Sequence, residues 1–286
     1  MPVGSIVIKN NPITLWEQFM LTLSPEEAKF DKYTQEDRDG GYYRASFSMY
    51  VDHVAASEFL ENGLGRHVEV YDNQSIRTFE GFIFEIVRDV GSTISSISLQ
   101  NMINKAWMRS DHDGDQVVER GTTLSVLKSQ AKYGIKEGVL SGGELEGLTV
   151  ADQSAQQYLN SRAWPNPESD VGAGSGIPHV QVYCRGYIET LAWRVYNQTV
   201  LTGTQGANAQ IEDILDAVGQ FVKAYYVDAN STQVTKEYDA DRRADNIIRG
   251  IASLGDQNNR RWIAYMLDNL TFYYSQAKPS IPLSQV

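Results

Sequence analysis

The acidic run Asp-His-Asp-Gly-Asp is the stretch whose side chains come closest to a known chemistry. Asp111, Asp113 and Asp115 offer carboxylate oxygens, which are the ligands that Ca²⁺ prefers. A helix–loop–helix calcium loop starting at Asp111 needs glycine at its sixth position and a carboxylate at its twelfth. The chain has Gln116 and Thr122 there instead. We therefore interpret the run as a solvated turn, and leave open whether it binds a cation.

The histidines and the cysteine show no pattern of a metal or catalytic site. No histidine lies three or four residues from another histidine or a cysteine, the spacing that a local metal pair needs. The single cysteine, Cys184, lies in an apolar strand-like run, which predicts a small buried residue rather than a reactive thiol. The four histidines are His53, His67, His112 and His179.

Sequence motifs for the common enzyme classes are also missing. The chain has no G-x-S-x-G nucleophile elbow, no phosphate-binding P-loop, no G-x-G-x-x-G and no H-E-x-x-H. A Ser-His-Asp set that forms only in space stays open. We predict no catalytic, cofactor-binding or metal-binding residue and no cofactor.

Aromatic residues near the C-terminus have two interpretations. They could form a flat platform for a sugar, or they could alternate between the two faces of a terminal hairpin that turns at Asp268-Asn269. We favour the hairpin. The residues are Trp262, Tyr265, Phe272, Tyr273 and Tyr274.

Composition and charge exclude several classes of protein. Among 286 residues, 25 are Lys or Arg and 36 are Asp or Glu, which gives a net charge of −11. Binding to nucleic acid or to an anionic membrane requires clustered basic residues, and the chain has none. No stretch is long and apolar enough for a transmembrane helix, and the N-terminus does not resemble a signal peptide. The hydrophobic content of 42% is sufficient for a folded core.

Alternating residues between 66 and 99 predict three antiparallel strands joined by tight turns. The strands are expected at 66–71, 77–89 and 93–99, followed by a short helix at 100–107. The strand at 77–89 carries apolar residues on both faces, so we expect both of its faces to be covered, or one to lie in a core and the other in an interface. This pattern predicts an α+β fold made of small antiparallel β-barrel or sandwich modules with helical insertions.

Helical spacing and breakers divide the chain further. A helix capped by Thr122 or Thr123 and a second that starts with a capping box at Thr149 are expected before a Pro/Gly-rich stretch at 164–178. Two amphipathic helices come after it, and Gly255 ends the second. The predicted parts are an N-terminal β-barrel-like module at 1–110, a helical insertion and Pro/Gly linker at 111–177, and a C-terminal α+β module at 178–286. A faint similarity between 97–107 and 182–193, both expected as strand, kink and short helix, would make the last part a second barrel-like repeat.

The strand pair in the first part resembles the barrel module of phage tail hub proteins. In that module a G-R-x-V-x-V-Y strand, here residues 65–71, precedes a strand with F/W-x-G-x-I, here Phe79, Gly81 and Ile83. The chain also resembles tail proteins of long-tailed phages and prophages over most of its length, most strongly between residues 58 and 107. The other similar pieces are SQAKYGI, RAWP, GYIETLAWRVYNQT and GIASLGDQNNRRW, and none of them is a catalytic signature.

The resemblance implies a non-enzymatic structural protein of a phage tail tip or baseplate. Such a hub-like subunit would form a homo-oligomeric ring, a trimer rather than a hexamer, that closes or extends the channel of the tail tube. Its implied partners are the tail tube, the distal tail protein, the tape measure and other tail-tip proteins. Its implied location is the virion, after assembly in the host cytoplasm.

Alternatives remain beside this expectation. The chain could be the distal tail (adaptor) protein, which forms a hexameric ring, or a carbohydrate-binding or cell-wall-degrading tail component. The carbohydrate alternative predicts carboxylates gathered in a cleft beside an exposed Trp or Tyr. An enzyme whose pocket leaves no sequence motif is a further possibility.

Overall fold

The computed structural model shows an α+β protein with two compact units. The larger unit comprises Met1–Asp37 and Tyr42–Tyr187, and the smaller unit comprises Arg38–Gly41 and Ile188–Val286. Within the described residues, no helix is long and apolar enough to cross a membrane. The structure describes residues 3–11, 20–23, 30–91, 93–111, 119–145, 147–171, 178–197, 203–236 and 241–277.

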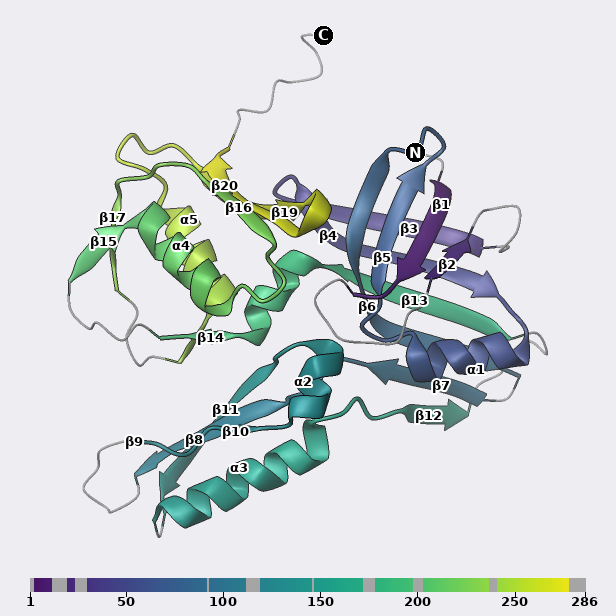
Figure 1. Ribbon diagram of the computed structural model, residues 1–286, viewed down its shortest axis with the longest axis horizontal. Coiled ribbons are helices and arrows are strands. Elements are labelled where there is room, and N and C mark those ends of the chain that lie inside the picture. Colours follow the sequence, from purple (N-terminus) through teal and green to yellow (C-terminus); the bar gives the residue numbers. More distant parts are fainter. Residues whose placement is uncertain are drawn as a thin grey trace. The chain divides into compact units, whose positions relative to one another are not determined.

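A nine-stranded sheet forms the main part of the larger unit (Figure 1). Seven strands are arranged in the order β2-β1-β5-β6-β13-β4-β3, and β7 joins β6 to β12. The pairings among β1, β2, β4, β5, β6, β7, β12 and β13 are all antiparallel. The strands are β1 (Val3–Lys9), β2 (Met20–Leu23), β3 (Phe30–Arg38), β4 (Gly41–Tyr50), β5 (His67–Asp72), β6 (Arg77–Val90), β7 (Thr93–Ser98), β12 (Glu168–Val171) and β13 (His179–Gly186).

The 14-residue strand β6 holds the sheet together. On one edge it pairs with β13 along most of its length, and on the other edge its first half pairs with β5 and its second half with β7. A bulge at Tyr183/Cys184 shifts the register with β13 by one residue. Such a bulge bends a strand and increases its twist. Residues 79–84 of β6 are all buried, so both faces of the strand are covered over this part, whereas Glu85 and residues 87–90 are only half-buried.

The expected barrel is not closed. Among the described residues no hydrogen-bonded pairing joins the outer strands β2 and β3, so the sheet stays open. One helix, α1 (His53–Asn62), packs on β6, and Gly63 comes directly after its end as the sequence predicts. The carboxylate of Asp52 caps this helix by accepting a hydrogen bond from the backbone N–H of Ala55 at 2.8 Å.

The division of the chain differs from the predicted boundaries. Strand β13 lies between β6 and β4, so residues 179–186 belong to the first unit and not to a module that starts at 178. The reason is its alternation, in which apolar side chains such as Val180 and Val182 fill the core of the N-terminal sheet. The predicted insertion at 111–177 belongs to the same unit.

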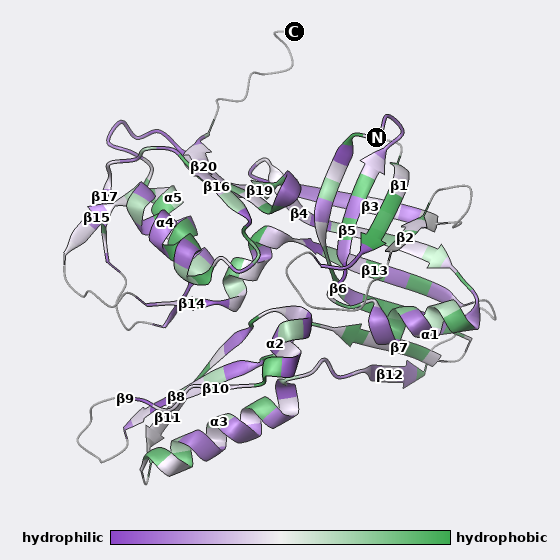
Figure 2. Cartoon of the chain, viewed as in Figure 1, coloured by the Kyte–Doolittle hydropathy of each residue, from purple (hydrophilic) through white to green (hydrophobic). Residues whose placement is uncertain are grey.

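This inserted segment forms a small sheet covered by a helix. Strand β11 runs parallel to β8, and α3 packs its buried face, which includes Ala155 and Leu159, on this sheet. Figure 2 shows polar and apolar residues alternating around α3, as expected for a half-covered helix. The elements are β8 (Lys105–Asp111), β9 (Glu119–Arg120), β10 (Leu124–Ser125), α2 (Leu127–Tyr133), β11 (Glu137–Glu144) and α3 (Leu148–Arg162).

Several local expectations fail in this segment. The helix predicted at 100–107 is wrong, because Lys105 already begins β8 and pairs with β10 and β11. Helix α2 does not start at a threonine cap, since Leu124 and Ser125 are taken up by strand β10. The carboxylate of Asp152 does not complete a capping box but accepts a hydrogen bond from the backbone N–H of Thr122 at 2.9 Å.

The smaller unit packs two helices beside short sheets. Helices α4 and α5 carry the predicted apolar stripes, and Gly255 ends α5 with a φ of 69°. The predicted terminal hairpin is confirmed, with its turn at Asp268–Leu270. The elements are η1 (Tyr187–Trp193), β14 (Val195–Tyr196), β15 (Thr204–Gly206), α4 (Ala207–Val218), β16 (Ala224–Val227), β17 (Gln233–Thr235), β18 (Arg242–Arg243), α5 (Ala244–Leu254), β19 (Trp262–Leu267), η2 (Asp268–Leu270) and β20 (Thr271–Gln276).

The internal similarity does not correspond to a structural repeat. After β7 the chain turns and enters strand β8, whereas after β13 it forms the 3₁₀ helix η1. The two segments therefore both contain a strand but differ in the element that comes after it.

A pair of facing glycines allows β6 and β13 to approach closely, and this gives a first prediction. Gly81 pairs with Gly186, and a Cβ at Gly81 would lie 2.3 Å from the carbonyl oxygen of Arg185. We expect Gly81→Ala to lower the free energy of unfolding by at least about 3 kcal/mol in urea titrations, because backbone must move to admit the methyl group. Gly143→Ala is the control, since nothing lies within 4 Å of its Cβ position. Equal effects of the two variants would contradict the prediction.

Candidate functional site

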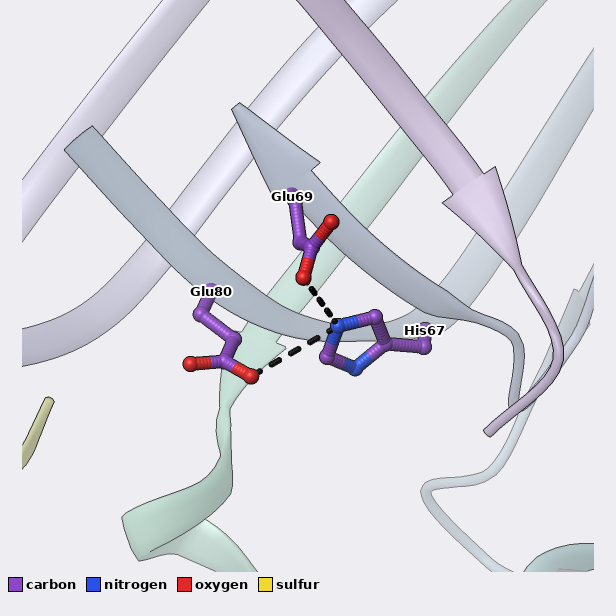
Figure 3. A group of neighbouring side chains, drawn as sticks. All are labelled: His67, Glu69 and Glu80. Carbon is purple, nitrogen blue, oxygen red and sulfur yellow. Dashed lines mark hydrogen bonds and ion pairs between the residues drawn. The ribbon is translucent and has the colours of Figure 1, made fainter. Parts of the chain in front are cut away.

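The main cluster of titratable side chains lies where β1, β5 and β6 run side by side. His67 and Glu69 alternate along β5 and therefore point to the same face of the sheet. The register places Glu80 of β6 directly opposite Glu69, and Lys9 of β1 opposite His67. All three residues drawn in Figure 3 are buried, and both carboxylates point to the same ring nitrogen of His67.

Hydrogen bonds fix the histidine ring from both sides. Its Nε2 lies 3.2 Å from Oε1 of Glu69 and 3.6 Å from Oε1 of Glu80. Its Nδ1 lies 2.8 Å from the hydroxyl of Tyr187, whose ring stacks on the imidazole at a centroid distance of 5.7 Å. The side-chain amide of Asn11 donates a hydrogen bond to the same hydroxyl at 3.2 Å.

Two cations balance the two carboxylates. The guanidinium of Arg77 bridges them, at 3.0 Å from Glu69 and 3.1 Å from Glu80. The ammonium of Lys9 lies 2.8 Å from the second oxygen of Glu69, and the hydroxyl of Tyr71 donates to that oxygen at 3.0 Å. Each buried charge therefore has a partner of opposite sign, which is the condition under which charges are tolerated inside a protein.

These contacts change the protonation equilibria of the cluster. Burial alone would raise the pKa of Glu69, but hydrogen bonds from His67 and Lys9 and the charge of Arg77 lower it to about 2. Burial raises the pKa of Tyr187 well above its ordinary value, and the nearby carboxylates add to this rise. Glu69 is thus held as an anion and Tyr187 as a neutral hydroxyl.

The geometry of the cluster would suit a metal ion, but its charges do not. Nε2 of His67 and one oxygen of each glutamate lie within 4.8 Å of one another. The distances of 3.2 and 3.6 Å from Nε2 to these oxygens are close to the roughly 3.4 Å that separates ligands around tetrahedral Zn²⁺. An ion would, however, lie beside Arg77 and Lys9, which already neutralise the carboxylates. We therefore interpret the cluster as a structural charge network.

Acid–base catalysis at this cluster would need access for a substrate. His67 is 2% exposed, and neither of two surface hollows formed by the described residues is lined by His67, Glu69 or Glu80. The network instead ties β1, β5 and β6 to Tyr187, the last residue of the larger unit.

The structure separates the residues that the sequence singled out. Cys184 is buried in β13, and burial raises the pKa of its thiol, in agreement with the predicted inert residue. His53 begins α1, and the ring of His179 lies tilted against that of Tyr50 at a centroid distance of 4.8 Å. Asp111 ends β8, whereas the other residues of the acidic run, His112 to Asp115, lie outside the described residues.

The aromatic residues of the terminal hairpin alternate between two faces, as expected. Trp262, Phe272 and Tyr274 are buried in the core of the smaller unit. On the other face, Tyr265 and Tyr273 stack with centroids 5.2 Å apart, and Tyr226 of β16 continues the stack at 5.4 Å from Tyr273. Rings stacked against each other leave mainly their edges to solvent, so they do not form a flat platform.

Sequence reasoning missed the His67 network because it searched for neighbours along the chain. The alternation of His67 and Glu69 was visible, but Glu80 joins them only through the β5–β6 register. Pairing of two strands joined by a short turn is the signal that could have revealed it.

Comparisons of the chain with protein-family models, with curated proteins and with solved structures found no match. Inferences about function therefore rest on the residue patterns and on the geometry described above.

The depressed pKa of Glu69 predicts a specific dependence of stability on pH. Because the folded value is about 2 and the ordinary value is near 4.5, Glu69 contributes stability above pH 4.5, and this is lost as the pH falls toward 2. The contribution at neutral pH is about 3 kcal/mol. We expect Glu69→Gln to lower the free energy of unfolding by up to this amount at pH 7, and the difference from wild type to vanish near pH 2.

Urea titrations across this pH range would measure the difference. Glu58→Gln is the control, because Glu58 is exposed on α1. A loss of stability in Glu69→Gln that is the same at pH 7 and pH 2 would show that packing, and not charge, holds the cluster.

The charge balance also predicts the response to zinc. Thermal unfolding of the untagged wild-type protein should not change when Zn²⁺ is added, because Arg77 and Lys9 already satisfy the carboxylates. In Arg77→Met the two glutamates lose their shared cation, so Zn²⁺ should raise the melting temperature of this variant. Adding His67→Ala should abolish the rise. A zinc-dependent stabilisation of wild type that His67→Ala removes would contradict the structural interpretation.

Proposed function

We propose that the chain is a non-enzymatic structural subunit of a phage tail tip or baseplate, a hub-like protein that forms a homo-oligomeric ring. The observation that carries this proposal is the open sheet of the larger unit. Its outer strands β2, β3 and β12 each pair with a single neighbour among the described strands. A sheet with such edges can be extended by a strand from another chain.

Exposed apolar side chains support assembly, one of them on an edge strand and two elsewhere on the larger unit, on α1 and in the β5–β6 turn. All four residues of β12 are exposed, and Val171 at its end is 88% exposed. Val54 and Ile76 of the same unit are 77% and 58% exposed. Ring closure requires head-to-tail interfaces that cover surfaces left open in a single chain. Solvent-exposed valine and isoleucine are suitable residues for such surfaces.

The residues that carry the resemblance to tail hub proteins have packing roles. Phe79 and Ile83 are fully buried, and Gly81 faces Gly186 across the strand pair. A pattern of this kind supports a shared scaffold rather than a shared reaction. It favours a barrel-like hub module in which neighbouring subunits complete the sheet.

The proposed subunit has a structural role, which is to form a ring that closes or extends the channel of the tail tube. A trimeric ring is favoured over a hexamer, and it would contact the tail tube, the distal tail protein, the tape measure or other tail-tip proteins within the virion. The distal tail protein, with a hexameric ring, remains the second form of the same proposal. The net charge of −11 suits a channel wall along which DNA passes without binding.

The mass of the purified chain in solution tests this proposal. Light scattering with negative-stain imaging should show a trimer or a hexamer with a central hole. We expect Val171→Glu to shift the assembly toward monomer, because it adds a charge at the β12 edge. Leu254→Glu is the control, since Leu254 is 61% exposed on α5 in the smaller unit. A chain that stays monomeric and cleaves a cell-wall polysaccharide would contradict the proposal.

A further inference from the structure

One face of the large sheet carries a continuous row of polar side chains. The register places Ser46 of β4 and Glu85 of β6 on either side of Tyr183 of β13. Glu85 is in turn opposite Ser98 of β7, and the hydroxyl of Thr34 on β3 lies 2.7 Å from that of Ser46. The row thus crosses five strands, a distance of roughly 19 Å along the sheet. The opposite face at this level is apolar, with Val182 and Ile86 in the core.

The row passes through two surface hollows that share Glu85. They have volumes of about 420 and 480 Å³. The first is lined by residues of β3, β4, β6 and β13, and the second by residues of β6 and β7, the end of α3 and the segment after it. Because Glu85 lines both, the two hollows adjoin at this residue and together form a groove over the sheet.

The second hollow combines an exposed aromatic ring with many polar groups. Trp164 is 44% exposed, and its indole is held by an edge contact with Tyr133 at a centroid distance of 6.3 Å. The floor is set by the sheet, where Ser96 of β7 lies opposite Glu168 of β12. The other polar groups that line it are Glu85, Ser98, Gln100, Asn101, Ser161, Arg162 and Asn166.

We propose that this groove binds a carbohydrate, a short linear oligosaccharide that lies along the polar row with one ring against Trp164. Carboxylates accept hydrogen bonds from sugar hydroxyls, amides both donate and accept, and an indole face packs against the C–H face of a pyranose ring. Among the described residues the side chains of Glu85, Asn101 and Glu168 make no hydrogen bond, so these groups are available to a ligand.

Other ligand classes fit this groove less well. The two hollows together are lined by three glutamates and three arginines, so they offer no excess of positive charge to a phosphate or a nucleic acid. The net charge of −11 of the chain also disfavours such ligands. The second hollow is lined mainly by polar residues, which disfavours a lipid or an apolar peptide there. A neutral ligand with many hydroxyls matches both the charge and the polarity.

This inference is independent of the proposed assembly. Ring formation is measured by mass and imaging, whereas sugar binding is measured by titration, so either can fail without the other.

The experiment is a calorimetric titration of the full chain with chitotetraose, cellotetraose and maltotetraose, supported by a glycan array. We expect saturable binding of at least one linear oligosaccharide. Trp164→Ala should weaken it at least tenfold, and Trp164→Phe should retain part of the affinity because an aromatic ring remains. Glu85→Gln should weaken it several-fold, since a charged acceptor shared by both hollows is lost.

Matched controls distinguish the groove from a general effect. Tyr50→Ala removes an aromatic ring that is also 44% exposed but lines neither hollow, and Glu61→Gln removes an exposed carboxylate on α1. Both should bind within twofold of wild type. Near-ultraviolet circular dichroism checks that each variant is folded. Absence of binding to every glycan, or binding that Trp164→Ala and Glu85→Gln leave unchanged in folded protein, would overturn the proposal.

Discussion

The backbone of β6 is the constraint on which the larger unit depends. Each N–H and C=O group of a central strand needs a partner when the strand is buried, and β6 is too long for one neighbour on its second edge. The chain meets this requirement by pairing the first half with β5 and the second half with β7, while β13 pairs along the opposite edge. The bulge at Tyr183/Cys184 of β13 lies opposite residues 83–85 of β6, close to the point where the partner of β6 changes from β5 to β7. Strand β6 therefore positions both the buried charge network around Glu80 and the two surface hollows that meet at Glu85.

Two glutamates of β6, five residues apart, show how different these surfaces are. Glu80 is 4% exposed and bonded to Arg77, so its charge is neutralised inside the protein. Glu85 lies beyond the bulge at the junction of the two hollows, where water or a ligand can reach it. A glutamate therefore stabilises the fold at position 80 of β6, whereas a glutamate at position 85 remains available for binding. Local packing, not residue type, decides between these roles.

Alternation and helical spacing in the sequence were sufficient to predict the local elements. Strands β5, β6 and β7, helices α4 and α5 and the terminal hairpin all lie where these patterns indicate. Long-range pairing was not predictable in this way. The residues of β13 read as a strand, but nothing in their sequence specifies partners about a hundred residues earlier. Strand β11 was missed because Gly142 and Gly143 resemble a break; the register with β8 does shift at these two residues, but β11 pairs with β8 again at Glu144.

The same limit applies to function. The His67 network and the polar row both consist of residues that are ordinary in sequence and become a group only through cross-strand register. The proposed ring assembly and the proposed carbohydrate binding also involve different parts of the sheet. Strand addition occurs in the plane of the sheet, through backbone groups at its edges, whereas the polar row projects from one face. A neighbouring subunit that pairs with an edge strand would therefore extend the sheet without requiring the side chains of Glu85 or Tyr183. Assembly and carbohydrate binding are in this sense compatible, because they draw on different atoms of the same strands.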